Sequence, residues 1–131
     1  EKSISFLGRI ENDELYRRMR ASSVVVAPAL HGESFGIVLL EAMAANSCVV
    51  ATDIPGYRDV ARSGVEAVLV EPGNSAALRL AIENILNDDI LRKSLQRAGI
   101  TRSQEFSVPK VVDKYIEIYK QAIGQEKLKS D

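Results

Sequence analysis

The sequence contains a single cysteine and no long apolar run, and each absence excludes a class of protein. One cysteine cannot form an internal disulfide, and Cys48 lies in the apolar run SCVVAT, which predicts a buried, unreactive thiol. No apolar stretch reaches the ~18 residues that span a bilayer, and the chain opens with Glu1-Lys2-Ser3 instead of a signal peptide. We therefore expect a cytoplasmic protein, in which any membrane contact of a longer parent is peripheral, at the inner face of the membrane.

Neither sign of charge is in clear excess. The sequence has 17 basic and 18 acidic side chains, a net charge of -1, so no basic face is expected that would bind nucleic acid. With 46% hydrophobic and 27% charged residues, the 131 residues have the balance of one globular domain. A second complete domain does not fit in this length.

Short β-branched runs alternate with longer segments of helical period, a pattern typical of βαβ units around a parallel sheet. The chain is therefore predicted to be α/β, with strands at Ser3–Leu7, Ser23–Pro28, Val49–Thr52 and Ala67–Val70. Asn12 or Asp13 is the expected cap of the first helix, and Pro55-Gly56 is expected to form a turn. The predicted helices are Glu14–Ala21, Ile37–Ala45, Ser75–Leu86 with Ser75 as its cap, Asp88 or Asp89 to about Phe106, and a last helix capped by Ser107.

The last predicted helix repeats apolar residues at helical spacing, which predicts one packed face. The residues of this face are Val112, Tyr115, Ile116, Tyr119 and Ile123.

The segment GESFGIVLLEAMAA, residues 32 to 45, lies between a predicted strand and a predicted helix, at the carboxyl edge of the sheet where open α/β sheets bind ligands. If Ser34 caps the helix, the amides of Phe35, Gly36 and Ile37 are unpaired donors at the positive end of the helix dipole. Such a terminus suits phosphate. Gly36 lacks a Cβ, so a ligand can approach the backbone closely.

Two glutamates flank this predicted anion site. Glu41 lies in an otherwise apolar helix, where an unpaired carboxylate would be costly to bury, so it needs a partner. It stands about 6 Å beyond Ile37 along the helix axis, within reach of a ribose diol next to a bound phosphate. Glu33 precedes the helix and is expected to accept hydrogen bonds from neutral sugar hydroxyls. The alternative is a pair of surface carboxylates on an ordinary helix.

The spacing of Glu33 and Glu41 within GESFGIVLLEAMAA resembles the Glu-x7-Glu motif of family 4 retaining glycosyltransferases, which have the GT-B fold, and most of all the phosphatidylinositol mannosyltransferase branch. The runs FLGR, SVVVAP and VVATDIPG extend the resemblance along the chain. The resemblance implies that residues 1–131 form the second half of a Rossmann-like donor-binding domain with C-terminal helices. The first half of that domain, with its basic pair that grips the diphosphate, and the acceptor-binding domain would lie outside this chain.

The resemblance also assigns roles to individual residues. Glu33 would contact the donor sugar and is the candidate catalytic residue, Glu41 would bind the ribose, and Ile10 and Asn12 would contact the base. The other donor-binding candidates are Gly32, Ser34, Phe35, Gly36, Ile37 and His31. His31, the only histidine, could also simply shape the loop. The donor would be a nucleotide diphosphate sugar such as GDP-mannose or a UDP-sugar, and the acceptor a glycan or lipid held by the missing domain; no metal or cofactor is implied.

Two other functions are compatible with these residues. The chain could be an inactive nucleotide-sugar-binding or interaction module, because half of the phosphate-gripping machinery is absent. It could also belong to another GT-B-like enzyme, such as a glycogen synthase or a sugar-nucleotide epimerase, although these surround the helix with different motifs. Independently of function, we expect Ser3–Leu7 to leave an open sheet edge through which the chain self-associates.

Overall fold

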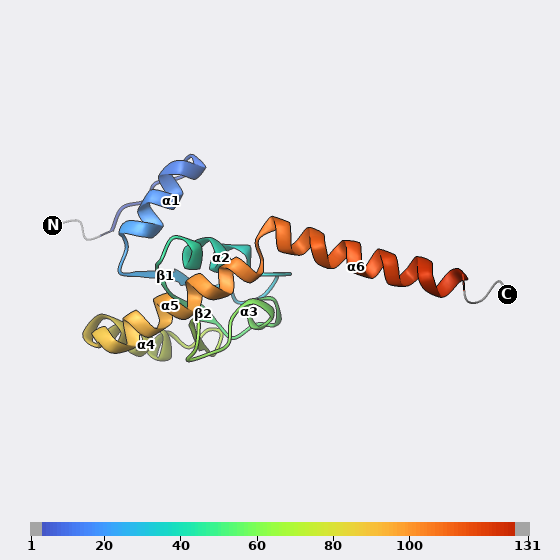
Figure 1. Cartoon of the computed structure of the whole chain (residues 1–131). Helices are drawn as coiled ribbons and strands as arrows, with labels where there is room; N and C mark the ends of the chain where they lie inside the picture. Colours follow the sequence, from blue (N-terminus) through green and yellow to red (C-terminus); the bar gives the residue numbers. More distant parts are fainter. Residues whose placement is uncertain (1–3, 128–131) are drawn as a thin grey trace.

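The computed structural model describes residues 4–127 and has a three-stranded parallel sheet at its centre (Figure 1). The strands β1 (Val24–Ala27), β2 (Cys48–Thr52) and β3 (Val68–Val70) lie side by side in that order, with Val25 opposite Val49 and Ala51 opposite Leu69. The crossover from β1 to β2 contains α2 (Ile37–Ala44), and the crossover from β2 to β3 contains α3 (Pro55–Val60). The predicted α/β class with a parallel sheet is confirmed.

Helices cover both faces of the sheet, because every residue of β2 is buried and successive side chains point to opposite faces. Val49 and Ala51 pack in one cluster with Leu39 and Met43 of α2. Cys48 and Val50 pack in a second cluster, to which α4 (Ser75–Asn87) and α5 (Asp89–Glu105) contribute Ile85 and Leu95. Burial raises the pKa of the Cys48 thiol, which is the inert buried cysteine predicted from the sequence.

The helix starts agree with the expected caps only in part. The Asp88 carboxylate accepts from the amides of Ile90 and Leu91 at 2.9 Å and caps α5 as predicted. Asn74, and not Ser75, caps α4, because the residue before the first helical turn must have non-helical dihedral angles. The helix α1 (Asn12–Ala21) has Glu11 at its N-cap position without a side-chain hydrogen bond.

Two predictions about the chain before and after β2 are wrong. Residues 4–7 form no strand; the side chains of Ile4 and Phe6 are 68% and 97% exposed, and Ser3 lies outside the described residues. A strand needs a hydrogen-bonded neighbour, and β1 is paired here with β2 alone among residues 4–127. The open edge expected at Ser3–Leu7 therefore loses its structural basis, and self-association stays a prediction. Pro55-Gly56 opens α3 instead of a turn, because proline suits the first helical position.

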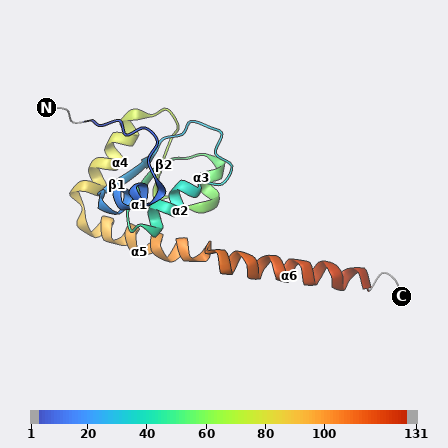
Figure 2. The ribbon, with the colours of Figure 1, turned by 90° about the horizontal axis from the view of Figure 1, so that it is seen from above.

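The last helix, α6 (Val108–Lys127), extends away from the rest of the molecule (Figures 1 and 2). The apolar face predicted for it is largely exposed: Tyr115 and Tyr119 are 59% and 65% exposed, and the side chain of Ile123 lies outside the described residues. The prediction of a packed face is thus wrong for Val112 to Tyr119, because no surface within residues 4–127 covers it. None of the described helices has both the length and the apolarity needed to cross a membrane.

Candidate functional site

The glutamate-bearing loop, residues 28–36, leaves the carboxyl end of β1, next to the carboxyl end of β2. This is the edge at which ligands of open parallel sheets bind. The loop is anchored at its start by Thr52, the buried last residue of β2, whose hydroxyl donates to the Ala29 carbonyl. The position predicted for the motif, between a buried strand and a helix at the carboxyl edge, is therefore the one observed.

The helix cap predicted at Ser34 is wrong. Gly36 occupies the N-cap position with φ 75° and ψ 39°, the left-handed conformation that glycine adopts without cost, while Ser34 is exposed and makes no capping bond. The first helical amides are therefore those of Ile37 and Val38. Within the described residues no protein acceptor is bonded to either of them, so both are available to an anion at the positive end of α2.

The first turn of α3 lies directly beneath the loop. A Cβ on Gly56 would stand 2.3 Å from the carbonyl oxygen of Glu33 and 3.0 Å from the amide nitrogen of Phe35. A Cβ on Gly36 would stand 2.8 Å from Cδ1 of the buried Tyr57. Glycine at both positions lets the loop rest on α3. The segment VVATDIPG is thus part of the site, although the sequence pattern alone indicated only a strand and a turn.

Glu33 is exposed at the surface of this support. The pKa of Tyr57 is raised, first by burial of its hydroxyl and second by the negative charge of Glu33, so the tyrosine stays neutral beside that carboxylate. Glu33 makes no hydrogen bond or ion pair with another described residue. Its oxygens are free to accept hydrogen bonds from neutral hydroxyls. Residues 4–127 contain no group of three acidic, histidine or cysteine side chains that could hold a metal ion.

Glu41 is exposed, so the premise that its carboxylate is buried was wrong. The inward face of α2 consists of Leu39, Ala42 and Met43, and Glu41 lies off this face. It opens into a cavity of about 230 Å³, whose other lining residues come from α1: Asn12, Asp13, Leu15, Tyr16 and Met19. The structure therefore brings together Glu41 and Asn12, the predicted ribose and base contacts, from distant parts of the sequence.

The remaining residues predicted from the sequence do not line the Glu41 cavity. Ile10 is half-buried just before α1 and does not line the Glu41 cavity. His31 and Gly32 are exposed in the loop, and Gly32 has φ 89°, which favours glycine there. Phe35 is partly exposed and meets the ring of Phe106 edge-on, with centroids 5.6 Å apart. Phe35 therefore has a packing role that the sequence did not indicate.

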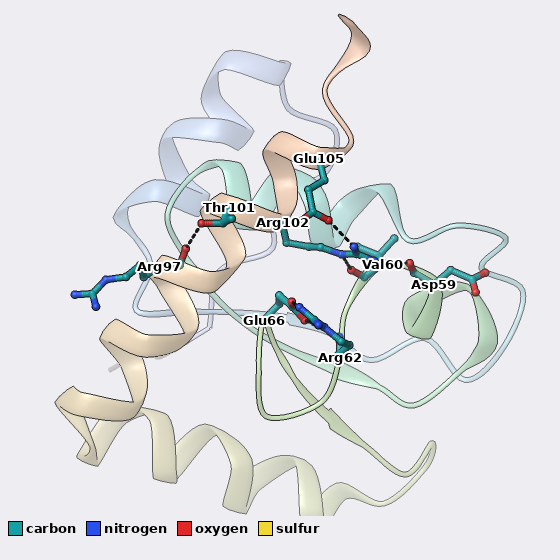
Figure 3. Close-up of polar contacts among 8 residues, drawn as sticks. All are labelled: Asp59, Val60, Arg62, Glu66, Arg97, Thr101, Arg102 and Glu105. Carbon is teal, nitrogen blue, oxygen red and sulfur yellow. Dashed lines mark hydrogen bonds and ion pairs between the residues drawn. The ribbon is translucent and has the colours of Figure 1, made fainter. Parts of the chain in front are cut away.

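A larger hollow, with a volume of about 700 Å³, lies elsewhere, between α5 and the loop after α3. Four of its charged groups form two ion pairs, Arg62 with Glu66 and Arg102 with Glu105. Burial opposes ionisation of Glu66, but hydrogen bonds from Arg62, at 2.8 Å from its amide and 3.0 Å from Nε, lower the pKa of Glu66 overall. Arg102 bonds to Glu105 and to backbone carbonyls, and Arg97 points away from them (Figure 3). Both carboxylates that line the hollow are thus paired with arginines, so it is a weaker candidate than the loop.

The sequence resembles known proteins along most of its length. The family described as Glycosyl transferases group 1 matches residues 1–102. A phosphatidyl-myo-inositol mannosyltransferase of Mycobacterium leprae is 40% identical over 116 residues, which are 88% of this chain and 31% of that protein. The chain thus spans about a third of the length of the curated relatives it matches.

Solved structures resemble it as well. Sucrose-phosphate synthase of Thermosynechococcus elongatus has a TM-score of 0.81 and 29% identity, covering 92% of this chain and 30% of the other. HepE of Anabaena in complex with UDP has a TM-score of 0.75 and 26% identity, covering 80% of this chain and 29% of the other. HepE has also been solved in complex with UDP-glucose. These neighbours have the GT-B fold, which confirms the predicted Rossmann-like arrangement.

Proposed function

The chain belongs to the family of group 1 glycosyl transferases, and we propose from this premise that it is the donor-binding portion of a retaining hexosyltransferase. The observation that carries the proposal is the order of groups along one edge of the sheet. Glu33 is exposed before α2, the amides of Ile37 and Val38 stand unpaired at its start, and Glu41 opens into a cavity one turn further on. A sugar, a diphosphate and a nucleoside follow one another in the same order.

Each group has the chemistry that its part of the donor needs. Unpaired amides at a helix N-terminus bind phosphate oxygens, whereas Gly36 serves the packing of the loop on Tyr57. A carboxylate such as Glu41 accepts from both hydroxyls of a ribose, and the Asn12 amide in the same cavity can hydrogen-bond a base. Glu33 carries no partner and would orient the sugar through its hydroxyls. We place the diphosphate at Ile37 and Val38, with the nucleoside towards α1.

The donor sugar and base follow from the relatives only by analogy. The Mycobacterium leprae relative is named a mannosyltransferase, and HepE was solved with UDP and with UDP-glucose. These names support a nucleotide diphosphate hexose, with GDP-mannose and UDP-glucose as the donors to test. The acceptor, a glycan or lipid, would bind to a domain that this chain does not contain, since the chain covers about a third of its relatives.

In the proposed reaction the bond between the anomeric carbon and the diphosphate oxygen breaks, and an acceptor hydroxyl forms the new bond on the same face. The acceptor proton leaves with the nucleoside diphosphate. Amide donors at the start of α2 would stabilise the charge that develops on the leaving phosphate. Glu33 holds the sugar in place in this scheme and forms no covalent bond to it.

Titration of the ¹⁵N-labelled chain with GDP-mannose, GDP, UDP-glucose and UDP, followed by NMR, tests the proposal. We expect shifts at residues 33 to 41 and at Asn12. Glu41→Ala should weaken nucleotides and nucleotide sugars alike, and Glu33→Ala should weaken only nucleotide sugars, each by about tenfold for one charged hydrogen bond. Glu117→Ala, exposed on α6, is the matched control. If Glu41→Ala bound GDP and UDP as tightly as the wild type does, the assignment of Glu41 to the ribose would be refuted.

An inactive nucleotide-sugar-binding or interaction module is the second candidate. It is favoured by one observation: the chain covers about a third of its relatives, so other groups needed for transfer can lie outside it. Binding without transfer or hydrolysis, in a protein that contains this chain and an acceptor domain, would favour the module. Transfer of hexose by that protein, abolished by Glu33→Ala, would favour the enzyme.

A further inference from the structure

The short helix α3 supports the glutamate-bearing loop but cannot be stable by itself. It has only six residues, far fewer than an isolated helix needs in water. At its start it bears the loop, because Gly56 lies under the Glu33 carbonyl and Tyr57 under Gly36. The position of Glu33 therefore depends on whatever holds α3 in place.

The other end of α3 is held by an arginine from α5. The guanidinium of Arg102 donates from Nε to the Val60 carbonyl at 2.8 Å and from Nη2 to the Asp59 carbonyl at 3.1 Å (Figure 3). These are the last two carbonyls of α3, which have no partner inside the helix. The positive charge also stands at the negative end of the helix dipole. The arginines nearer in sequence, Arg58 and Arg62, bind Asp53 and Glu66.

Arg102 reaches the loop by a second route. Its guanidinium carbon lies 4.7 Å from the ring centre of Phe106, and that ring meets Phe35 of the loop edge-on at 5.6 Å. Glu105 fixes the remaining side of the guanidinium, with Nη1 to Oε2 at 2.6 Å. The side chain of Arg102 is only 24% exposed. One planar group thus touches both the end of α3 and the aromatic pair that borders the loop.

We propose that Arg102 is a positioning residue for Glu33. It acts through α3, on which the Glu33 backbone rests, and through the Phe106 and Phe35 rings. Arg102 contacts the C-terminal end of α3, whereas the loop rests on its N-terminal end. The proposal rests on the proposed function for its ligand readout, because Glu33 is taken there as the sugar contact. Its structural readout, the hydrogen exchange of α3 and the NMR amide signals of the loop, does not depend on any ligand.

The test compares Arg102→Ala with Arg97→Ala. Arg97 is the matched control, since it lies on α5, is exposed and points away from α3 (Figure 3). In Arg102→Ala we expect the hydrogen-bonded amides of Tyr57, Arg58 and Ala61 to exchange at least tenfold faster, with exchange in β2 unchanged. The NMR amide signals of residues 30 to 36 should shift as well, because the loop rests on α3. We also expect a loss of about tenfold in affinity for GDP-mannose or UDP-glucose, with GDP and UDP affinities kept. Arg97→Ala should change neither quantity.

Arg102→Lys keeps the charge but cannot bond to both carbonyls and to Glu105, so it should give a smaller change of the same kind. This variant replaces Arg102→Ala in the test if the alanine variant unfolds. Two results would overturn the proposal. One is unchanged exchange at Tyr57, Arg58 and Ala61 together with unchanged amide signals at residues 30 to 36. The other is an equal rise in exchange throughout the chain with equal losses for all four ligands, which would make Arg102 a contributor to stability alone. If the wild-type chain bound none of the four ligands, the proposed function would fail, and the exchange of α3 with the loop signals would still decide the role of Arg102.

Discussion

Replacing Gly56 by alanine should displace the glutamate-bearing loop. The added Cβ would stand 2.3 Å from the carbonyl oxygen and 2.9 Å from the carbonyl carbon of Glu33. Both are backbone atoms, so no side-chain rotation can relieve the contact, and the loop must move by about 1 Å to reach ordinary contact. Overpacking of this kind costs about 1 to 3 kcal/mol, and the better helix propensity of alanine returns at most about 1 kcal/mol. We expect a net loss of about 1 to 2 kcal/mol in the free energy of unfolding.

Gly99→Ala is the matched comparison. Gly99 lies inside α5, and its added Cβ would meet Cγ of Met43 at 3.0 Å, which belongs to a flexible side chain that can turn aside. The change in the free energy of unfolding should therefore be within about 1 kcal/mol of zero. Urea denaturation measures both variants. The NMR amide signals of the loop should also shift in Gly56→Ala. A Gly56→Ala protein as stable as wild type, with an unchanged loop, would refute the inference that the loop rests on α3.

Three further outcomes follow from the contacts. The interactions that lower the pKa of Glu66 stabilise the fold above about pH 4.5, and this stabilisation is lost as pH falls through the folded-state pKa. Glu66→Gln should therefore lower the free energy of unfolding by about 1 to 3 kcal/mol at pH 7 and by less at pH 3, as measured by urea titration. Thr52→Val removes the donor to Ala29 and should lower the free energy of unfolding by about 1 kcal/mol, with shifted NMR amide signals in residues 29 to 36. The chain alone should bind GDP-mannose or UDP-glucose only at millimolar concentration, because one exposed helix terminus contributes about 0.3 to 1 kcal/mol to the binding of an anion. Micromolar binding in the NMR titration would contradict this prediction.

The elements built on strong apolar patterns were predictable from the sequence. The runs around Val24–Ala27 and Cys48–Thr52 are apolar without alternation, which is the pattern of strands covered on both faces, and the structure buries β2 completely. The start of α5 was predictable from Asp88, because its cap uses neighbouring amides. Such features depend on residues close in the sequence, and their boundaries differ from the structure by one or two residues.

The errors arise where distant residues decide the outcome. The run SISFL has the composition of a strand, but a strand forms only beside a partner, and none of the described strands pairs with residues 4–7. Ser34 has a side chain that often caps helices, yet the N-cap of α2 lies two positions later, at Gly36. There Tyr57 approaches so closely that only a glycine, in the left-handed conformation, fits. Glu41 could not be placed because α2 is apolar on almost every side, so periodicity does not indicate which face is buried.

A pair of glutamates eight residues apart is therefore a weak indicator of a donor site when taken by itself. Any exposed helix can carry two such carboxylates, and the spacing says nothing about the conformation of the first one. In this chain the conformation of Glu33 depends on Gly36 and on a second glycine, Gly56, which follows the neighbouring strand and admits the Glu33 carbonyl. A side chain larger than hydrogen at Gly56 would occupy the volume in which that carbonyl lies. The two glutamates together with a glycine after the next strand, at a position where it packs under the loop, make a more specific criterion, because each element is required by a contact.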